Sequence, residues 1–217
     1  QEEKTCRAIH YDSSEFSCNN SFEAEIVCEI PETVTYEGDV YTVVEIGALG
    51  ELHSFYGGKI KIPKTIISIG DRSFKGCNFS SITLPKGLRH IGDYAFENMD
   101  NLKSIKIPAG VETIGKKPFG VYGMKIKITN CSPHFEWDGY GLYSIKENRL
   151  VSLIISNADP DYVVKPGTEI IGAGATIYYY NKKGDRYFAK VILPEGLKVI
   201  ENCALSKVRI DELPQSI

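Results

Sequence analysis

One apolar motif recurs along the chain at a nearly constant spacing, and this recurrence constrains the fold more than any other feature. Equivalent runs begin at Ile60, Ile82 and Ile105, so the period is 22 and then 23 residues. A period of this length predicts a solenoid in which each repeat makes one turn of chain, called a rung here. Because one rung cannot bury its apolar side alone, stacked neighbours must supply the hydrophobic core.

The apolar positions within a rung fit neither a continuous helix nor one long strand. Their spacing predicts a short strand, a turn, a second extended piece and a short helical turn. Pro85 lacks an N–H and is expected to end the first strand. Gly92 is expected at a sharp turn with a positive φ. In this rung the apolar positions are Ile82, Leu84, Leu88, Ile91, Ala95, Phe96 and Leu102, and glycines equivalent to Gly92 are Gly47, Gly70, Gly115 and Gly172.

Equivalent side chains of neighbouring rungs are expected to touch, because paired strands lie about 4.8 Å apart. Phe74, Phe96 and Phe119 share one position in the repeat and therefore predict a continuous aromatic stack. Cys77 and Cys203 also occupy rung positions. We expect both to be small, buried hydrophobic side chains.

The pattern I/V-x-I/L-P-x-x-V/L-x-x-I-G-x-x-A-F closely resembles the BspA-type leucine-rich repeat of bacterial surface proteins, and the similarity extends from Val40 to Ser216. The resemblance implies a curved, right-handed leucine-rich-repeat solenoid of mostly short parallel β-strands with short helical turns. It also implies a secreted or surface-anchored protein that binds a partner. The family has no shared catalytic residue or ligand that could be transferred to this chain.

The chain is expected to form one structural domain with two parts. Residues 1–39 lack the repeat and are interpreted as an antiparallel β cap that includes a hairpin turn at Glu37. Residues 40–217 are interpreted as the solenoid, with hairpin insertions near 132–145 and 177–189, where the period is interrupted. For Cys6, Cys18 and Cys28, a disulfide in an oxidising compartment and buried free thiols are both open alternatives.

Composition and motifs exclude several classes of function. The chain has 25 Lys and Arg against 28 Asp and Glu, a net charge of −3, which does not favour nucleic acid. No apolar run is long enough to predict a transmembrane segment. Neither a catalytic motif nor a metal-binding spacing occurs, and the four histidines lie on different segments, so we expect no enzyme and no cofactor. The start at Gln1 is interpreted as the end left after signal-peptide removal, although an artificial start would look the same.

Two functions remain. The first is a non-catalytic binding or adhesion module, secreted or on the cell surface, that recognises a host or bacterial surface protein or glycan. The alternative is a structural spacer in a bacterial envelope assembly, without a small-molecule ligand. The oligomeric state is left open by the sequence.

Basic residues recur on the outward side of the first strand in each rung, and we call this surface the lysine face. Side chains alternate along a strand, so the residues beside each buried apolar position share one side. One interpretation is that lysines keep an exposed sheet soluble and discourage edge pairing. The other is a docking face for an anionic partner. The candidate binding residues here are Lys61, Lys106, Lys125, Lys127, Lys190 and Arg209. The outward positions contain no acid; the other six are Lys59, Ser81, Thr83, Ser104, Ile192 and Lys207.

A second candidate site lies on the predicted hairpin near residue 180. Tyr178, Tyr180 and Tyr187 alternate at strand spacing, and aromatic side chains beside polar groups suit a glycan. The hairpin either stands free of the solenoid or folds back as a lid over the rung at Ala173.

Overall fold

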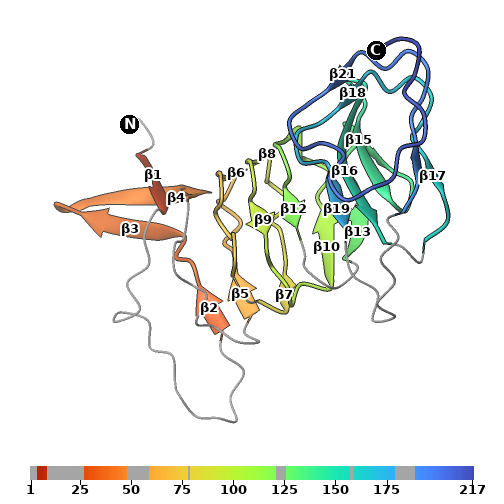
Figure 1. Cartoon of the computed structure of the whole chain (residues 1–217). Coiled ribbons are helices and arrows are strands. Elements are labelled where there is room, and N and C mark those ends of the chain that lie inside the picture. Colours follow the sequence, from red (N-terminus) through yellow and green to blue (C-terminus); the bar gives the residue numbers. More distant parts are fainter. Residues whose placement is uncertain are drawn as a thin grey trace.

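The structure, a computed structural model, describes residues 4–8, 27–47, 59–77, 79–120, 126–156, 159–178 and 189–217, with the side chains of Val27 and Tyr178 excepted. These residues form an elongated array of stacked turns, in which short strands of successive repeats lie side by side (Figure 1). None of the described residues is helical, so this part of the chain has no helix that could cross a membrane. The predicted short helical turns are therefore not confirmed. Turns without helix occupy such positions, for example over residues 71–76.

The first row of strands carries the lysine face. Its members are β2 (Val27–Glu29), β5 (Lys59–Lys61), β7 (Ser81–Ile82), β10 (Ser104–Ile107), β13 (Lys127–Asn130), β17 (Tyr162–Val163) and β20 (Val191–Ile192). Pairing is parallel in the groups β2-β5-β7, β10-β13 and β17-β20. Ile60 pairs with Ile82, and Ile105 with Ile128. The predicted register between rungs is confirmed.

Two further rows complete each turn of chain. The second row contains β1 (Thr5–Ala8), β4 (Asp39–Ile46), β6 (Ser68–Ile69), β8 (His90–Ile91) and β11 (Thr113–Ile114). The third row contains β9 (Phe96–Glu97) and β12 (Phe119–Gly120), which pair in parallel. All rung-to-rung pairs in these rows are parallel. The fold is therefore of the leucine-rich-repeat type, with many short parallel strands.

The array changes character after residue 126. Three antiparallel strands follow each other here, namely β14 (Phe135–Trp137), β15 (Gly141–Ser144) and β16 (Arg149–Ile155). Asp138 Oδ1 accepts hydrogen bonds from Tyr140 N and Gly141 N, which closes the first turn. β16 then pairs in parallel with β18 (Ile170–Ile171) and β19 (Thr176–Tyr178), and β18 pairs with β21 (Val199–Ile200).

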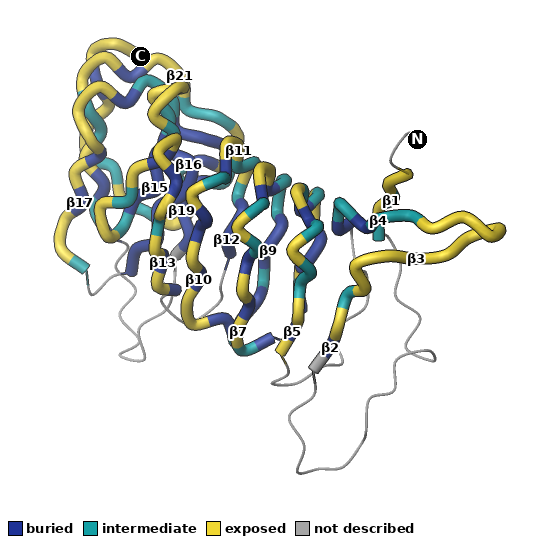
Figure 2. The backbone as a smooth tube through the Cα atoms, turned by 180° about the vertical axis from the view of Figure 1, so that it is seen from behind, coloured by how far each residue is buried: buried dark blue, intermediate teal, exposed yellow. Residues whose placement is uncertain are grey.

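At the N-terminal end the sequence prediction is only partly right. β3 (Thr33–Tyr36) and β4 form the predicted hairpin, with Glu37 and Gly38 at φ of 51° and 85°. The hairpin projects from the array and is largely exposed (Figure 2). The rest of the antiparallel meander is wrong, because β1 pairs in parallel with β4 and β2 in parallel with β5. In this pairing Cys28 stacks on Ile60, which extends the buried side of the repeats.

The predicted aromatic stack is confirmed. The rings of Phe74 and Phe96 lie 5.5 Å apart at 6°, and those of Phe96 and Phe119 lie 5.9 Å apart at 14°. None of the three is more than 1% exposed. Repetition at one position thus places the same ring on the same ring and fills the core.

The repeated glycines have a different role from the predicted one. Gly92 and Gly115 are not among the residues with positive φ, which instead fall two residues later, at Tyr94 (58°) and Lys117 (43°). A Cβ atom on Gly92 would lie 2.5 Å from Asp71 Oδ1 and 2.6 Å from Asp71 N. Glycine is therefore required because the preceding rung approaches closely, not because the chain turns left-handed.

Candidate functional site

The lysine face arises because side chains along each strand point alternately into the core and toward solvent. In β5 the exposed Lys59 and Lys61 flank Ile60, which is 5% exposed. β10 and β13 repeat the alternation, so that Lys106 and Lys127 are exposed beside buried isoleucines. The backbone therefore directs the basic side chains outward, as predicted.

An acidic side chain that the sequence analysis missed lies at the N-terminal end of this face. β2 pairs with β5 so that Glu29 is opposite Lys61, and the Lys61 ammonium forms an ion pair with Glu29 Oε1. Lys64 Nζ lies 3.9 Å from Glu32 Oε1 in the following turn. The signal was present in Cys28-Glu-Ile-Pro, which has the spacing of Ile60-Lys-Ile-Pro. It was missed because residues 1–39 were not considered part of the repeat.

At the C-terminal end the basic side chains are also paired. Lys190 and Arg209 form an isolated parallel bridge, and both bind Asp211. Lys190 Nζ lies 2.9 Å from Asp211 Oδ2, and Arg209 Nε lies 3.1 Å from Oδ1. The hydrogen bond from Lys190, supported by the charge of Arg209, holds the pKa of Asp211 below its ordinary value. The single carboxylate of Asp211 therefore balances one of the two positive charges.

The middle of the face is different. β10 and β13 are neighbours, and Lys127 pairs with Ser104 while Lys106 pairs with Thr129. Both lysines are exposed, and neither forms an ion pair with a residue that the structure describes. These two ammonium groups thus remain available to a partner, in contrast to those at the two ends.

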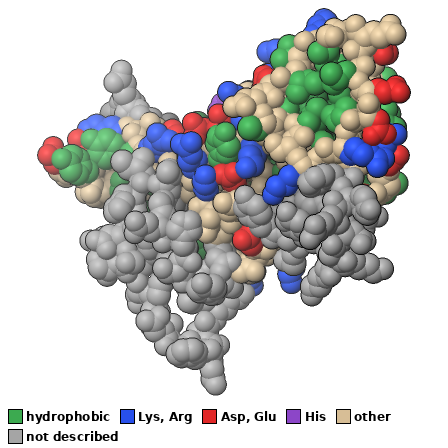
Figure 3. All heavy atoms as spheres, in the orientation of Figure 1, with side chains coloured by type: hydrophobic (Ala, Val, Ile, Leu, Met, Phe, Trp, Pro, Cys, Tyr) green, Lys and Arg blue, Asp and Glu red, His purple; other side chains and the backbone are tan. Residues whose placement is uncertain are grey.

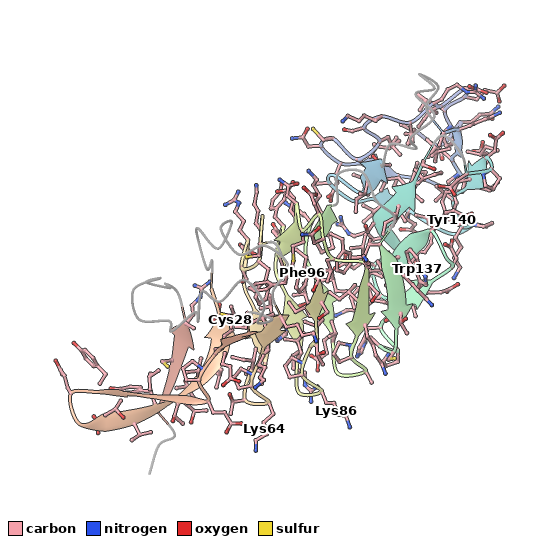
Figure 4. The ribbon with its side chains drawn as sticks, turned by 90° about the horizontal axis from the view of Figure 1, so that it is seen from below. Cys28, Lys64, Lys86, Phe96, Trp137 and Tyr140 are labelled. Atoms are coloured by element: carbon pink, nitrogen blue, oxygen red, sulfur yellow. The ribbon has the colours of Figure 1, made fainter. Side chains whose placement is uncertain are left out.

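An open groove of about 690 Å³ runs beside this middle section, over β5 and β7. Its polar lining is Lys59, Lys61, Lys64, Ser81, Thr83 and Lys86. Lys64 and Lys86, at equivalent positions in neighbouring rungs, point away from the array (Figure 4). No Asp or Glu lines the groove among the described residues. Because Lys61 and Lys64 are paired with Glu29 and Glu32, however, the groove has less positive charge available to an anion than its lining alone indicates.

The other candidate residues cannot be placed on a surface. Lys125, Tyr180 and Tyr187, with most of the predicted hairpin near 177–189, lie outside the described residues, as does the side chain of Tyr178. No group of three or more His, Cys, Asp or Glu side chains suited to a metal ion occurs in the described ranges. His90 is exposed, with Nδ1 2.9 Å from Thr113 Oγ1.

Two cysteine predictions have different outcomes. Cys77 is 2% exposed, as expected, and burial together with the neighbouring Cys28 raises the pKa of its thiol to about 12. Cys203 is exposed, so that prediction is wrong. It shares the rung position of Tyr94 and, like Tyr94, has a positive φ, 55°, which directs the side chain away from the core. Cys6 and Cys28 are not joined to each other by a disulfide, and Cys18 lies outside the described residues.

Comparison with known proteins finds a family match over slightly less than half of the chain. Residues 53–156 match the model of the BspA type leucine rich repeat region, in six copies. The crystal structure of the pneumococcal vaccine antigen PcpA is similar, with 20% identity and a TM-score of 0.47 over 97% of this chain and 64% of that chain. The chain thus spans 64% of the length of that antigen.

Two other crystal structures are similar at lower scores. A leucine rich cell surface protein from Faecalibacterium prausnitzii A2-165 shares 18% identity, with a TM-score of 0.36 over 87% of this chain and 71% of that chain. A leucine-rich repeat protein from Bacteroides ovatus ATCC 8483 shares 17% identity, with a TM-score of 0.39 over 88% of this chain and 81% of that chain. No curated protein matched the sequence.

Proposed function

Because residues 53–156 match the model of the BspA type leucine rich repeat region, we propose that the chain is a non-catalytic binding module, secreted or displayed on a bacterial cell surface. Its partner is an anionic protein or glycan, and the binding surface is the middle of the lysine face. The family match supports the general part of the proposal, a role at the cell surface. The arrangement of charged side chains supports the specific part, an anionic partner.

The observation that carries the proposal is the unequal pairing of charge along the face. Lys106 and Lys127 lie on neighbouring strands without an ion pair among the described residues, whereas Lys61 and Lys190 are paired with Glu29 and Asp211. An exposed ion pair contributes about 0–1 kcal/mol to stability. Lysines without such pairs on an exposed sheet attract an anion over about 8 Å at physiological ionic strength.

The candidate residues are expected to contribute unequally. Lys106 and Lys127 contribute most. Lys61, Lys190 and Arg209 contribute less, because a partner must compete with Glu29 and Asp211. Lys125 and the tyrosines Tyr178, Tyr180 and Tyr187 remain candidates for the same partner.

The overall shape that suits this role is a curved, right-handed solenoid whose N-terminal end is covered by residues 1–39. The pairing of β1 with β4 and of β2 with β5 supports this arrangement, because these strands continue two of the rows at that end. The cover prevents the apolar side of the first full rung from contacting water.

The test is a double charge reversal, Lys106→Glu with Lys127→Glu, probed on an array of sulfated, carboxylated and neutral glycans and acidic and neutral proteins. The wild-type chain is expected to bind acidic probes, and salt should weaken this binding. The double variant should lose it without a change in the thermal melt. A matched control, Lys146→Glu with Lys198→Glu, makes the same change of charge away from the face and should keep binding.

Two outcomes would contradict the proposal. One is binding that survives the double reversal or is independent of salt. The other is the absence of binding to every probe, which would favour the structural spacer that the sequence left as the alternative.

A further inference from the structure

A second surface, on the third row of the array, contains a hollow that the regular repeat would fill. At one position of each rung in this row the backbone has a positive φ, so that the side chain points outward. The residues at this position are Arg72, Tyr94, Lys117, Gly174 and Cys203, with φ of 55°, 58°, 43°, 61° and 55°. Four of the five carry a side chain that covers the surface, and the Arg72 guanidinium lies 5.3 Å from the centre of the Tyr94 ring. At Gly174 the covering side chain is missing.

A second side chain is missing nearby. Gly120 occupies the rung position that Glu97 holds in the preceding repeat, and the two residues are paired in register. Gly120 and Gly174 both line a hollow of about 410 Å³, which we call the junction hollow. It lies where the regular rungs meet the C-terminal part of the chain. Its volume falls within the range of about 300–1,000 Å³ that is common for small-ligand sites.

The walls of the junction hollow combine polar and basic side chains with apolar ones such as Ala173 and Ile177. Tyr94, Asn98, Lys116 and Lys117 line one side, and Asn202 and Lys207 line the other. No Asp or Glu is among the described lining residues. Figure 3 shows Lys and Arg side chains gathered over the middle of the array, around β9 and β12.

Two carboxylates near the hollow are paired with basic side chains, and a third, that of Asp93, accepts a hydrogen bond from Lys116 N. Glu97 is 5% exposed, with Oε1 2.5 Å from Lys117 Nζ and Oε2 2.7 Å from Lys75 Nζ. Glu201 Oε2 lies 2.9 Å from Arg149 Nη1 and accepts a hydrogen bond from Ala173 N. Lys117 is thus balanced by Glu97. Lys116 forms no ion pair with a described residue, so the hollow keeps a positive charge.

From these groups we infer that the junction hollow binds a single acidic sugar residue. A carboxylate on the sugar meets Lys116, since a charge-assisted hydrogen bond is the strongest contact the lining offers. The side-chain amides of Asn98 and Asn202 both donate and accept hydrogen bonds, which suits neighbouring sugar hydroxyls. The Tyr94 ring supplies an amphipathic wall. A phosphate or sulfate alone would leave the amides and the aromatic wall without a contact.

This site is separate from the lysine face, which lies on the first row. Either proposal can therefore be contradicted without affecting the other. Titration of the chain with glucuronic acid, N-acetylneuraminic acid and neutral glucose, followed by NMR, tests the inference directly. The acidic sugars should bind and glucose should not. Lys116→Gln should weaken the acidic sugars by about tenfold.

A second variant tests the shape of the hollow rather than its charge. Gly174→Asn restores a side chain at a left-handed position that asparagine tolerates, and its only close neighbour is the flexible Lys117 chain, 3.1 Å from the new Cβ. The filled hollow should lose the acidic sugars while the melt changes little. If this variant does not fold, Lys116→Gln still decides the matter.

The double variant Lys106→Glu with Lys127→Glu should keep the sugar affinity, because it leaves the junction hollow intact. Equal binding of acidic and neutral sugars, no binding of any of the three, or an affinity unchanged by Lys116→Gln would each overturn the inference. Loss of macromolecular binding in the double variant with sugar binding retained would show that the two surfaces act separately.

Discussion

The regular rungs over residues 59–120 and the part from residue 126 onward are stabilised in different ways. In the regular rungs each side chain stacks on its equivalent, as Phe96 does between Phe74 and Phe119. In the later part the antiparallel strands β14, β15 and β16 interrupt this stacking. The later part has a hydrophobic cluster of its own, and hydrogen bonds between side chains that occur once add to it.

The polar contacts show the same contrast. In the regular rungs Asp71 Oδ1 accepts a hydrogen bond from Asp93 N at 2.7 Å, and Asp93 Oδ1 accepts one from Lys116 N at 2.8 Å. In the later part Tyr143 Oη lies 2.5 Å from Tyr162 Oη, which donates to Asp138 Oδ2 at 2.6 Å. The first arrangement can be extended rung by rung, whereas the second cannot.

The junction between the two parts is where side chains are missing. Lys116 occupies the position that Asp71 and Asp93 hold in the preceding rungs. Its ammonium group cannot accept a hydrogen bond from the next rung, so the series of hydrogen bonds ends here. Gly120 and Gly174 lack the side chains that equivalent positions carry. A repeat protein thus gains a potential site where its repetition stops, because the irregular rung leaves space that a regular rung would fill.

The largest effect is expected from breaking the stack in the regular rungs. Phe96→Ala should destabilise the chain by about 3–5 kcal/mol, since a fully buried aromatic ring is removed from between two others. Denaturant unfolding, followed by circular dichroism, measures the change. Ile67→Ala, at a position 47% exposed, is the control and should cost far less. A loss of under about 1 kcal/mol for Phe96→Ala would contradict the stacking account.

A pair of glycine substitutions sharpens the comparison. Gly92→Ala places a Cβ 2.5 Å from Asp71 Oδ1 and 2.6 Å from the Asp71 backbone nitrogen, so the rungs must separate. We expect a loss of about 3 kcal/mol. At the equivalent Gly172 a Cβ would lie 2.9 Å from Leu150 O, and the loss should be about 1 kcal/mol. Equal losses at the two sites would mean that rung spacing does not differ between the parts.

The regular rungs were predictable because one pattern repeats. The register of Ile60 with Ile82 and the aromatic stack follow from the period, which leaves little freedom in how the rungs align. The reason for Gly92 was not predictable in the same way. A left-handed turn and a close approach both require glycine, and only the coordinates distinguish them.

The candidate site was predictable in its outline only. Alternation placed Lys106 and Lys127 outward, but the pairing of Lys61 with Glu29 depends on a strand that belongs to the repeat despite a weak motif. The junction hollow could not be predicted, since it depends on Gly120 and Gly174 being close in space although 54 residues apart in the sequence.

The later part should be most sensitive to the loss of one hydroxyl group. Tyr162→Phe removes the donor to Asp138 Oδ2 and leaves the buried Tyr143 hydroxyl with only the hydrogen bond that it accepts from Lys165 N, at a cost of about 2 kcal/mol. Burial raises the pKa of Tyr162, so the hydroxyl stays protonated near neutral pH. Chemical unfolding measures the loss, and Tyr36→Phe, at a ring 63% exposed, serves as the control. A Tyr162→Phe variant as stable as the control would show that the network contributes nothing.

The smallest effect concerns Glu97, the buried carboxylate of the regular rungs, and it depends on pH. Burial alone would raise its pKa, but hydrogen bonds from Lys117 and Lys75 lower it below the ordinary 4.5. A lowered pKa in the folded state means that the ionised carboxylate stabilises the fold above pH 4.5 and that this contribution is lost as the pH falls through the folded value.

Glu97→Gln should therefore cost about 1 kcal/mol at neutral pH, less than for a fully buried pair, because Lys75 and Lys117 can still reach water. The difference between wild type and variant should shrink as the pH is lowered below 4.5. Urea unfolding across that range measures it. Glu112→Gln, which removes an exposed partner 3.6 Å from Arg89, should be nearly neutral throughout. If the cost of Glu97→Gln does not change with pH, the loss of stability comes from a difference in packing between the two side chains and not from the charge of Glu97.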